Sequence, residues 1–581
     1  MKIFRHFSVL SFALLMSSLA FAAVDQTALK ESMMRDLDTI RGVFQVQYAP
    51  TSWKSQFSGW SVDTEIDKAK DQIKNTANIT VKDFQKILTQ FFLSMKDYHV
   101  SISYFSTEAA SLPLTIKGAE GRYFLAYIDR TKLTEAAFPF AIGDEVIAFD
   151  NKPVADEIAK LLKVVGHNVS ETDNELAMLN LTKRSASRGY DVPQGPVNLS
   201  IKSKAMNKIY TYQLMWTYTP EKISPLGLGT IKTVAQTVLR EGRSTTNTSV
   251  RSKVLAALNA QMLSPYAEEN PEAAAKENPF NLGSRKSFIP RLGSKIWESQ
   301  ADDIFDAYIF KNEKNQLIGY LRIPSYTPDD ADDAIAELKK IVARFELNTE
   351  GMVIDQVNNP GGSVFYLYAL AGLLSDQALR TPQHRMTINQ SQVFNAATTL
   401  PELEKVTNDD EAKKALGESL SGYETSYQVA QFLIRYFRFL TNEWNAGRTI
   451  TEPSYIAGVD QINPNLIRYT KPILLITNPL DFSGGDFFPA IMQDNKRVTV
   501  FGARTAGAGG YVLSVNYPNQ FGIQGFRLTG SIAERLSMNP IENLGVTPDK
   551  GFDYSLTASD YENNFADYVK AILGAVAKIT N

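Results

Sequence analysis

The sequence predicts an α/β fold built on a mostly parallel sheet that helices cover on both faces. From about residue 300, short apolar strands alternate with helical stretches, which is the pattern of parallel strands joined by crossover helices. Two glycine pairs, Gly361-Gly362 and Gly484-Gly485, each follow an apolar strand directly. In open α/β sheets the functional crevice lies beyond the carboxyl ends of the strands, so both turns are expected to face it.

The length and composition limit the classes of partner. A chain of 581 residues is expected to hold several domains, and 44% hydrophobic with 21% charged residues is a globular composition. The net charge is −3, with no basic block, which argues against nucleic acid as a partner. The chain has no cysteine, so disulfides, thiolate metal sites and a cysteine nucleophile are excluded.

The first 22 residues have the features of a secretory signal. Lys2 and Arg5 precede an apolar stretch at 8–19, which ends in Ala20-Phe21-Ala22. This pattern predicts cleavage after Ala22 and export to the periplasm or out of the cell. The alternative is an N-terminal membrane anchor, for which the apolar run is short. No other stretch reaches the roughly 18 apolar residues of a span, so no stable membrane insertion is expected after cleavage.

Two different regions precede the α/β part. Residues 23–111 are expected to be mainly helical, with a helix at 79–95 that leads to Asp97-Tyr98-His99 and then to a strand at 100–104. Residues 112–225 change to strands. The run 143–154 has a turn, a strand, a polar hairpin tip and a helix start, a pattern typical of PDZ domains, which bind extended peptides by adding a strand to their sheet.

The rest of the chain divides into a polar segment and the α/β core. Residues 226–295 are polar and contain several prolines, which predicts a flexible linker. The alternative is a short helical subdomain, with one helix over 250–262. Residues 296–581 form the expected core, with a helix-rich insertion at about 395–450.

The stretch 471–495 carries the first candidate for catalysis. An apolar strand leads into a turn that presents Ser483-Gly484-Gly485 at the start of a helix. A strand, a sharp glycine turn and a helix can expose a nucleophilic serine, and the helix N-terminus offers free N–H groups to an oxyanion. The alternative is a plain connection. A phosphate loop at 505–510 is excluded because the Lys-Ser/Thr of that motif is absent.

Several motifs in this order resemble the S41 peptidases, the tail-specific or C-terminal-processing proteases. The motifs are Asp97-x-His99, the PDZ-like pattern, Asn359-Pro360-Gly361-Gly362, the Ser483 turn, the loop at 502–509 and Gly545-Val546-x-Pro548-Asp549. The resemblance implies a ClpP/crotonase-like catalytic core with an inserted PDZ-like domain and a helical N-terminal region. It also implies hydrolysis of peptide bonds in protein or peptide substrates, without a cofactor or a metal.

One position differs from the usual motif of the family and indicates which subgroup the chain resembles. Bacterial processing proteases carry a lysine in a T-x-G-K-G loop after the serine, and Ala508 stands at that place here. The chain therefore resembles the chlamydial protease-like activity factor group, whose triad is Ser–His–Glu. The resemblance assigns the roles to Ser483, His99 and Glu542, with Glu534 and Asp549 as nearby alternatives for the acid.

The remaining site residues follow from the same resemblance. The N–H groups of Gly484, Gly361 and Gly362 are expected to form the oxyanion hole. Beside His99, only His167 and His384 remain after signal cleavage, and a three-histidine metal site would need all of them to converge. His167 falls in the PDZ-like region and is expected to be structural.

The resemblance further implies a zymogen, in which 226–295 is an internal inhibitory segment removed by self-cleavage. A homodimer is also compatible with it. Two other functions stay open at this stage: an inactive scaffold that binds peptide or an apolar ligand, and a lipase or esterase. Against the latter, the stretch Asp481-Phe482-Ser483-Gly484-Gly485 lacks the first glycine of G-x-S-x-G, and the triad order differs.

Overall fold

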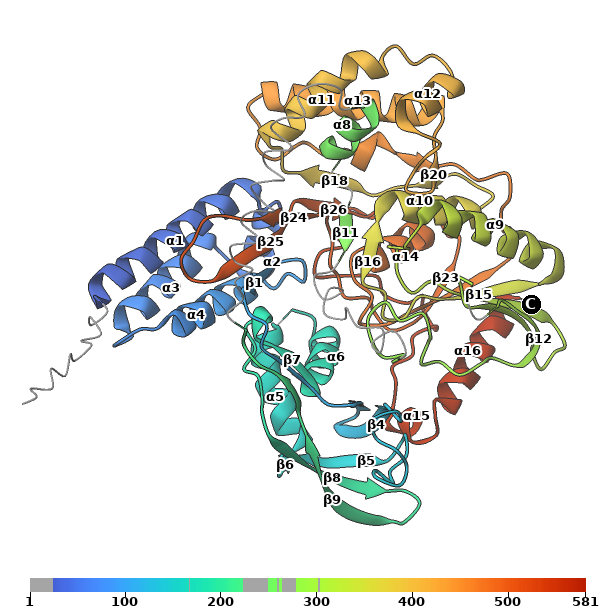
Figure 1. The fold of residues 1–581 in the computed structure, drawn as a ribbon. Helices are drawn as coiled ribbons and strands as arrows, with labels where there is room; N and C mark the ends of the chain where they lie inside the picture. The colour runs from blue at the N-terminus through green and yellow to red at the C-terminus, as the bar shows by residue number, and fades with distance from the viewer. Residues whose placement is uncertain are drawn as a thin grey trace, which may run out of the picture.

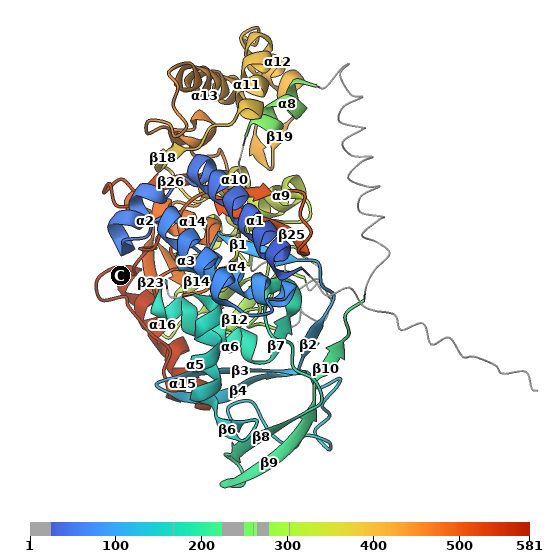
Figure 2. The ribbon, with the colours of Figure 1, turned by 90° about the vertical axis from the view of Figure 1, so that its left-hand side faces the viewer.

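The structure, a computed structural model, describes residues 25–166, 168–222, 249–258, 261–263, 278–300 and 303–580. The predicted signal at 1–22 and His167 lie outside the described residues. The chain forms an N-terminal helical region, a PDZ-like domain, an α/β core and a helical insertion (Figure 1). The N-terminal helices lie between the insertion and the PDZ-like domain (Figure 2). Within the described ranges, no helix combines the length and the apolar character that crossing a membrane requires.

The N-terminal helices fold together with a hairpin from the far end of the chain. Capping at Asp25 and a capping box at Thr80 start the first and fourth helices. Phe44 and Phe91 pack with Phe526 in one core, and the hairpin lies along these helices in Figure 1. The elements are α1 (Gln26–Gln47), α2 (Thr51–Ser58), α3 (Val62–Asn75), α4 (Val81–Ser94) and β1 (Ser101–Tyr104), with β1 pairing antiparallel to β25 (Ile523–Thr529) and β25 to β24 (Val512–Val515).

The PDZ-like domain is an antiparallel sheet with two helices. Asp150 and Asn151 have positive φ and form the predicted hairpin tip. The apolar core of this domain continues into Leu480 and Phe482 of the α/β core. The sheet order is β3 (Leu114–Ala119), β4 (Arg122–Ile128), β5 (Glu145–Phe149), β8 (Pro196–Ser203) and β9 (Lys208–Met215), with β6 (Lys152–Pro153), α5 (Val154–Val165), α6 (Ser170–Leu181), η1 (Ala186–Arg188) and a small sheet of β10 (Thr217–Thr219), β2 (Ala109–Ser111) and β7 (Lys183–Ser185).

The α/β core contains a six-stranded sheet with helices on both faces. Successive side chains of a strand point to opposite faces of the sheet. Met352 and Ile354 therefore pack against the helices on one face, and Val353 packs against those on the other. The order is β12 (Ser294–Glu298), β13 (Ala307–Lys311), β14 (Leu317–Arg322), β15 (Gly351–Asp355), β22 (Ile473–Thr477) and β23 (Thr499–Gly502), with α9 (Ala331–Asn348), α10 (Val364–Leu373) and α14 (Gly484–Asp494) on one face and α16 (Ala566–Ile579) on the other. Helix α15 (Ala558–Glu562) lies between α16 and strand β4 of the PDZ-like domain.

The predicted parallel sheet is confirmed for four of these strands. Strands β14, β15, β22 and β23 are parallel neighbours, whereas β12 and β13 pair antiparallel at one edge. Strand β12 begins at the end of the predicted linker and β13 follows it, and no crossover helix separates these two strands from each other or from β14.

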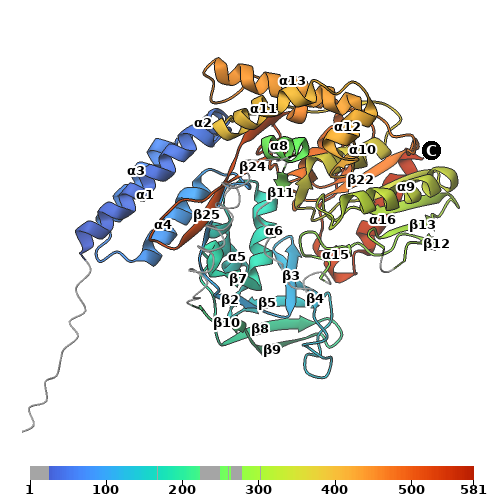
Figure 3. The ribbon, with the colours of Figure 1, turned by 45° about the horizontal axis from the view of Figure 1, so that its top comes forward.

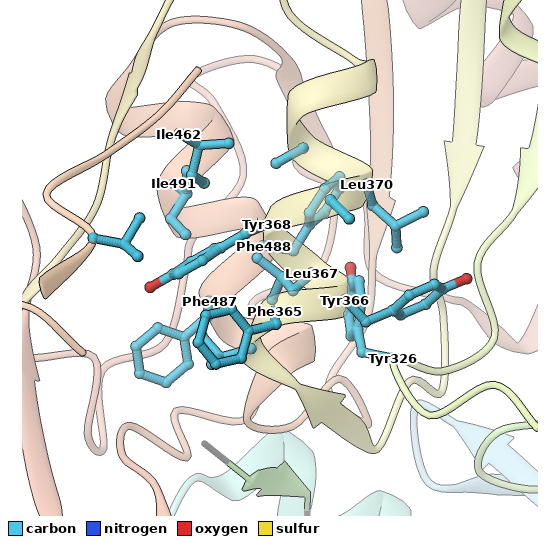
Figure 4. Close-up of a cluster of buried hydrophobic side chains, with 14 of the residues drawn as sticks. Tyr326, Phe365, Tyr366, Leu367, Tyr368, Leu370, Ile462, Phe487, Phe488 and Ile491 are labelled. Carbon is cyan, nitrogen blue, oxygen red and sulfur yellow. The ribbon is translucent and has the colours of Figure 1, made fainter. Parts of the chain in front are cut away.

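Helix α10 fixes the position of α14. All ten residues of α10 are buried, as expected for a helix that neighbours surround. Figure 4 shows Phe365 and Leu367 of this helix beside Phe488 of α14. Helix α14, whose N-cap is Ser483, therefore packs against a fully buried helix.

The insertion is helical, as predicted. Helix α8 (Val250–Ala257), from the polar segment, packs among its helices (Figure 3). The insertion and its flanks comprise β17 (Leu379–Arg380), β18 (Gln383–Met386), α11 (Gln390–Leu403), α12 (Asp409–Leu416), β19 (Ser419–Leu420), β20 (Tyr423–Glu424), α13 (Tyr427–Asn445), η4 (Ile456–Gly458) and β21 (Gln461–Ile462), with β18 pairing to β26 (Ser531–Glu534).

Much of the described part of 226–295 is packed, unlike a linker. Arg251 of α8 donates to the carbonyl of Leu416 at 2.8 Å. The alternative of one helix over 250–262 is also wrong, because α8 ends at Ala257 and β11 (Gln261–Leu263) follows as a strand. Phe280 and Phe288 are buried against α16. Because these apolar residues are few, the overall composition of the segment stays polar and does not predict that it packs.

Candidate active site

Ser483 lies in a strained turn between β22 and α14. Its φ of 58° and ψ of −111° are unusual for a residue other than glycine. Its N–H donates to Asp486 Oδ2 at 2.7 Å. The side chain is fully buried, and within the part of the chain that the structure describes its Oγ has no hydrogen-bond partner. A strained serine with an uncommitted hydroxyl is the arrangement of a nucleophile elbow.

The two glycine pairs meet, as the sequence predicts. A Cβ on Gly484 would lie 3.1 Å from Gly361 Cα and 3.2 Å from Gly362 N. Gly362 is in turn pressed against Tyr326, whose carbonyl carbon would lie 2.2 Å from a Cβ at this position. Glycine is required at 362 because any side chain would overlap that backbone. The strand β16 (Gly361–Ser363) therefore runs directly beside the start of α14.

Side chains of Asn359 and Asp481 lock the two turns together. The Phe482 N–H donates to the Asn359 carbonyl at 2.8 Å, and the Asn359 N–H donates to Asp481 Oδ1 at 2.9 Å. Gly361 N–H donates to Asn359 Oδ1 at 2.9 Å. The backbone around Ser483 is therefore held from both sides.

Asp486 fastens the glycine-rich loop to the same turn. Besides Ser483 N–H, its carboxylate accepts Gly507 N–H at 2.8 Å and Ala508 N–H at 2.9 Å. Burial raises the pKa of Asp486 to about 7, and these donors oppose that rise. We did not predict this role. The Ser-x-x-Asp spacing of a capping box at 483–486 could have indicated it.

His99 lies between α4 and β1 and is fully buried. Neither ring nitrogen has a hydrogen-bond partner among the described residues. Burial lowers the pKa of His99 to about 4, Asp97 raises it, and Arg527 and Lys54 lower it. The imidazole is therefore neutral at pH 7, which is the state of a general base.

Glu542 lies beside His99 without a hydrogen bond to it. One ring nitrogen of His99 and one carboxylate oxygen each of Asp97 and Glu542 lie within 4.8 Å of one another. Glu542 Oε2 accepts Gly509 N–H at 2.9 Å, and Oε1 accepts from the Lys54 ammonium. Burial raises the pKa of Glu542, Asp97 raises it further, and Lys54 lowers it.

The other acids and the other described histidine lie elsewhere. Asp549 accepts Gln493 Nε2 at 3.0 Å and Val500 N–H at 2.7 Å, and Glu534 lies on β26. His384 stacks on Phe487, and its Nδ1 lies 3.2 Å from Ser531 Oγ. Among the described residues, Glu542 is therefore the glutamate of the cluster that contains His99.

Lys54 and Asn543 are buried residues of the site that sequence reasoning missed. The Lys54 ammonium donates to Glu542, to Asn543 Oδ1 at 2.8 Å and to the Lys96 carbonyl at 2.7 Å. A lysine on a short polar helix normally faces solvent, so no local signal marks it. We assign no metal to this cluster because the ammonium already supplies the positive charge that faces Glu542.

Comparisons with known proteins agree with the fold. A family model described as peptidase family S41 matches residues 317–551, and a PDZ domain model matches 108–223. A protein of Chlamydia muridarum is 33% identical over 571 residues, which covers 95% of this chain and 93% of the relative. A protein of Chlamydia trachomatis is 33% identical over 576 residues, with the same coverage.

Solved structures give the same result. The crystal structure of mature CPAF has a TM-score of 0.79 at 32% identity, covering 95% of this chain and 98% of that one. A serine-to-alanine mutant of CPAF has a TM-score of 0.82 at 31% identity, with the same coverage. Fold and comparisons together define a serine peptidase with a PDZ domain ahead of the catalytic core. The chain belongs to peptidase family S41 and is of the CPAF type, so the predicted family and fold class are confirmed.

Proposed function

We propose that this protein is an exported serine endopeptidase that cleaves protein substrates. Ser483 would be the nucleophile, His99 the general base, and Glu542 the carboxylate of the triad. The observation that carries the proposal is the Ser483 turn, in which a strained serine with an uncommitted hydroxyl meets two glycine turns. A neutral, buried histidine on a segment packed against the same turn supports the second role, because the ring of Tyr98 contacts that of Phe482.

In the proposed reaction His99 accepts the proton of Ser483 Oγ as the oxygen attacks the substrate carbonyl. Glu542 and Asp97 stabilise the resulting imidazolium. His99 then protonates the leaving amine, and water hydrolyses the acyl-enzyme with His99 again as base.

Backbone N–H groups would hold the oxyanion. Gly484 is the first residue of α14, and the N–H of a first helical residue has no acceptor inside its helix. Gly362 N lies close to it. Gly361 N–H is already donated to Asn359, so of the three expected donors we retain Gly484 and Gly362. Loss of one such donor typically costs about 10²–10³ in rate.

Self-processing is the second part of the proposal. Strand β11 pairs antiparallel with β16, with Met262 opposite Gly362. The segment thus pairs with the strand that carries a proposed oxyanion donor, where an extended substrate would also bind. We infer that 226–295 is an inhibitory segment and that cleavage within it releases β16.

A fluorophosphonate probe tests the proposed nucleophile, because only an activated serine reacts with it. After incubation that allows processing, the wild type should be labelled at Ser483. Ser483→Ala and His99→Ala should not be labelled, while Ser514→Ala, on the exposed part of β24, should be labelled as the wild type is. Labelling of Ser483→Ala would assign another nucleophile. Absence of labelling in a folded, cleaved wild type would favour the inactive binding scaffold.

Parallel incubation of the wild type and Ser483→Ala tests self-processing. We expect cleavage within 226–295 only in the wild type, with activity rising as the intact chain disappears. The two fragments should stay associated, because β1 and β25 pair across them. An intact wild type with full activity would contradict the zymogen.

Export and oligomeric state have their own tests. Cell fractionation with N-terminal sequencing should find a chain that begins after Ala22. Light scattering of the purified protein distinguishes a monomer from a homodimer.

A further inference from the structure

We propose that Lys54 is a positioning residue of the active site, which fixes the place and the negative charge of Glu542 so that this carboxylate can face the His99 imidazolium. The inference rests on the triad of the proposed function. It adds a residue from the N-terminal helical region to a site whose other groups come from the turn after α4 and from the catalytic core.

The contacts of Lys54 use its whole hydrogen-bonding capacity. An ammonium has three donors, and here they meet Glu542, Asn543 Oδ1 and the Lys96 carbonyl. Two of these acceptors belong to adjacent residues of the turn that carries the acid. The third lies three residues before His99. Lys54 therefore connects the Glu542 turn to the segment that carries the base.

Asn543 completes this connection. Its Oδ1 also accepts from Trp53 Nε1 at 2.9 Å, and its Nδ2 donates to the Lys96 carbonyl at 2.7 Å. Asn543 has a positive φ of 65°, a conformation that asparagine tolerates better than most residues. Trp53 and Lys54, which are consecutive residues of α2, thus both donate hydrogen bonds to Asn543, the residue that follows Glu542. These hydrogen bonds set the position of the carboxylate relative to His99.

The charges of the buried cluster show why an ammonium is needed. With His99 neutral, the buried cluster holds two carboxylates, Asp97 and Glu542, and the Lys54 ammonium, and the charge of Arg527 also acts on His99. Transfer of the serine proton to His99 adds a further positive charge, which the carboxylates offset during the reaction. A fully buried carboxylate without a cation takes up a proton. Burial and Asp97 already raise the pKa of Glu542, and Lys54 opposes that rise. Without Lys54 the carboxyl group would therefore keep its proton to a higher pH and would stabilise the imidazolium less.

Asp97 has different partners from Glu542 and contacts the backbone of His99 directly. Its Oδ1 accepts the backbone N–H of His99 at 2.9 Å. Its Oδ2 accepts Tyr48 Oη at 2.9 Å and Thr529 Oγ1 at 2.8 Å. Asp97 thus shapes the turn of His99, while Glu542 is the carboxylate that Lys54 holds.

The test compares kcat, KM and the pH profile of Lys54→Met and Lys54→Arg with the wild type. The methionine has a similar length without the charge, and the arginine keeps the charge. The groups that face Glu542 and His99 are Lys54 on α2, Tyr48 at the end of α1, Asp97 before β1 and Arg527 on β25. Lys68→Met, at an exposed position of α3, is the matched control.

We expect Lys54→Met to lower kcat at pH 7 by about 100-fold or more, with KM changed less than about threefold. The acid limb of the kcat–pH profile of Lys54→Met should shift to higher pH by more than about one unit, because Glu542 would ionise only at higher pH. Lys54→Arg should keep the limb of the wild type and most of its kcat. A folded Lys54→Met with the kcat and acid limb of the wild type would overturn the inference.

A double variant keeps the test valid if Lys54→Met fails to fold, because Lys54→Met/Glu542→Gln removes both charges of the buried Lys54–Glu542 pair together. We expect it to be as active as Glu542→Gln alone, within about threefold, since Lys54 would act only through Glu542. A further loss of about 30-fold would overturn the inference. If Glu542→Gln itself were fully active, the proposed triad would fail instead, so the two failures can be distinguished.

Discussion

The ring of Tyr98 packs edge-on against the ring of Phe482, with their centroids 5.5 Å apart and their planes at 81°. Each ring belongs to the residue before a proposed catalytic group. The hydroxyl of Tyr98 also donates to Asp173 Oδ1 of α6 at 2.8 Å. One side chain therefore joins the N-terminal region, the PDZ-like domain and the catalytic turn, and it brings His99 to the side of the sheet that carries Ser483.

The variant Glu542→Gln should be impaired but not inactive. The amide fills the same space and can still accept Gly509 N–H, but it cannot offset the charge of the imidazolium. We expect kcat to fall by roughly 10²–10⁴ with KM nearly unchanged, and to stay above that of Ser483→Ala. Steady-state kinetics with an unstructured protein substrate measures this. The control Glu534→Gln should match the wild type; an equal loss there would point to a general effect on folding.

A lysine at the position used by other S41 peptidases should not create a Ser–Lys dyad here. Ala508 is fully buried in the apolar cluster that joins the PDZ-like domain to the catalytic turn. Ala508→Lys would place an ammonium there without a designed partner, which typically costs several kcal/mol. We expect a clearly lower Tm and no recovery of activity in Ala508→Lys/His99→Ala. Recovered hydrolysis in that double variant would show that the serine turn accepts a lysine base.

Asp486 should prove essential for the shape of the serine turn. Asp486→Ala leaves the N–H groups of Ser483, Gly507 and Ala508 without their acceptor, and each unsatisfied buried donor costs about 1–3 kcal/mol. We expect loss of fluorophosphonate labelling and a Tm lower by several degrees. Asp486→Asn, which keeps one acceptor oxygen, should lie between. Wild-type labelling in Asp486→Ala would mean that the loop holds its position without this carboxylate.

Acid should destabilise the protein through its buried neutral histidines. Burial lowers the pKa of His384 to about 3 from an ordinary 6.5. Below pH 6.5, His384 therefore binds a proton in the unfolded chain but not in the folded chain. The free energy of unfolding falls as the pH drops toward 3. In the Ser483→Ala background, which prevents self-cleavage, the Tm should fall between pH 7.5 and 5. His384→Phe should reduce this fall, and an undiminished fall would assign the acid sensitivity to other groups.

Proline substitutions in β11 should speed activation. Successive residues of a strand direct their N–H groups to opposite sides, so one of Met262→Pro and Leu263→Pro removes a ladder bond to β16. We expect that variant to process itself several-fold faster than the wild type on a gel time course. The other variant is the internal control. Unchanged rates in both would argue that pairing of β11 with β16 does not restrain the enzyme.

The sequence by itself determined the family and the fold class, and it indicated most residues of the proposed site. Strand and helix periodicity predicted the parallel strands, and the glycine pairs marked the two turns that meet at Ser483. The motifs around His99 and Glu542 pointed to residues that do share one buried cluster. These signals are local, because a turn, a strand or a cap is encoded within a few neighbouring residues.

Only the tertiary structure decided which charges face one another. Lys54 and Asn543 have ordinary sequence neighbourhoods, yet both are buried and Lys54 donates hydrogen bonds to Glu542 and to Asn543. The packing of 278–295 into the core and the pairing of β11 with β16 were equally invisible, since both depend on partners far along the chain. The energy of a buried ion pair or a strand pairing is set by its surroundings after folding, and single-residue propensities do not carry that information.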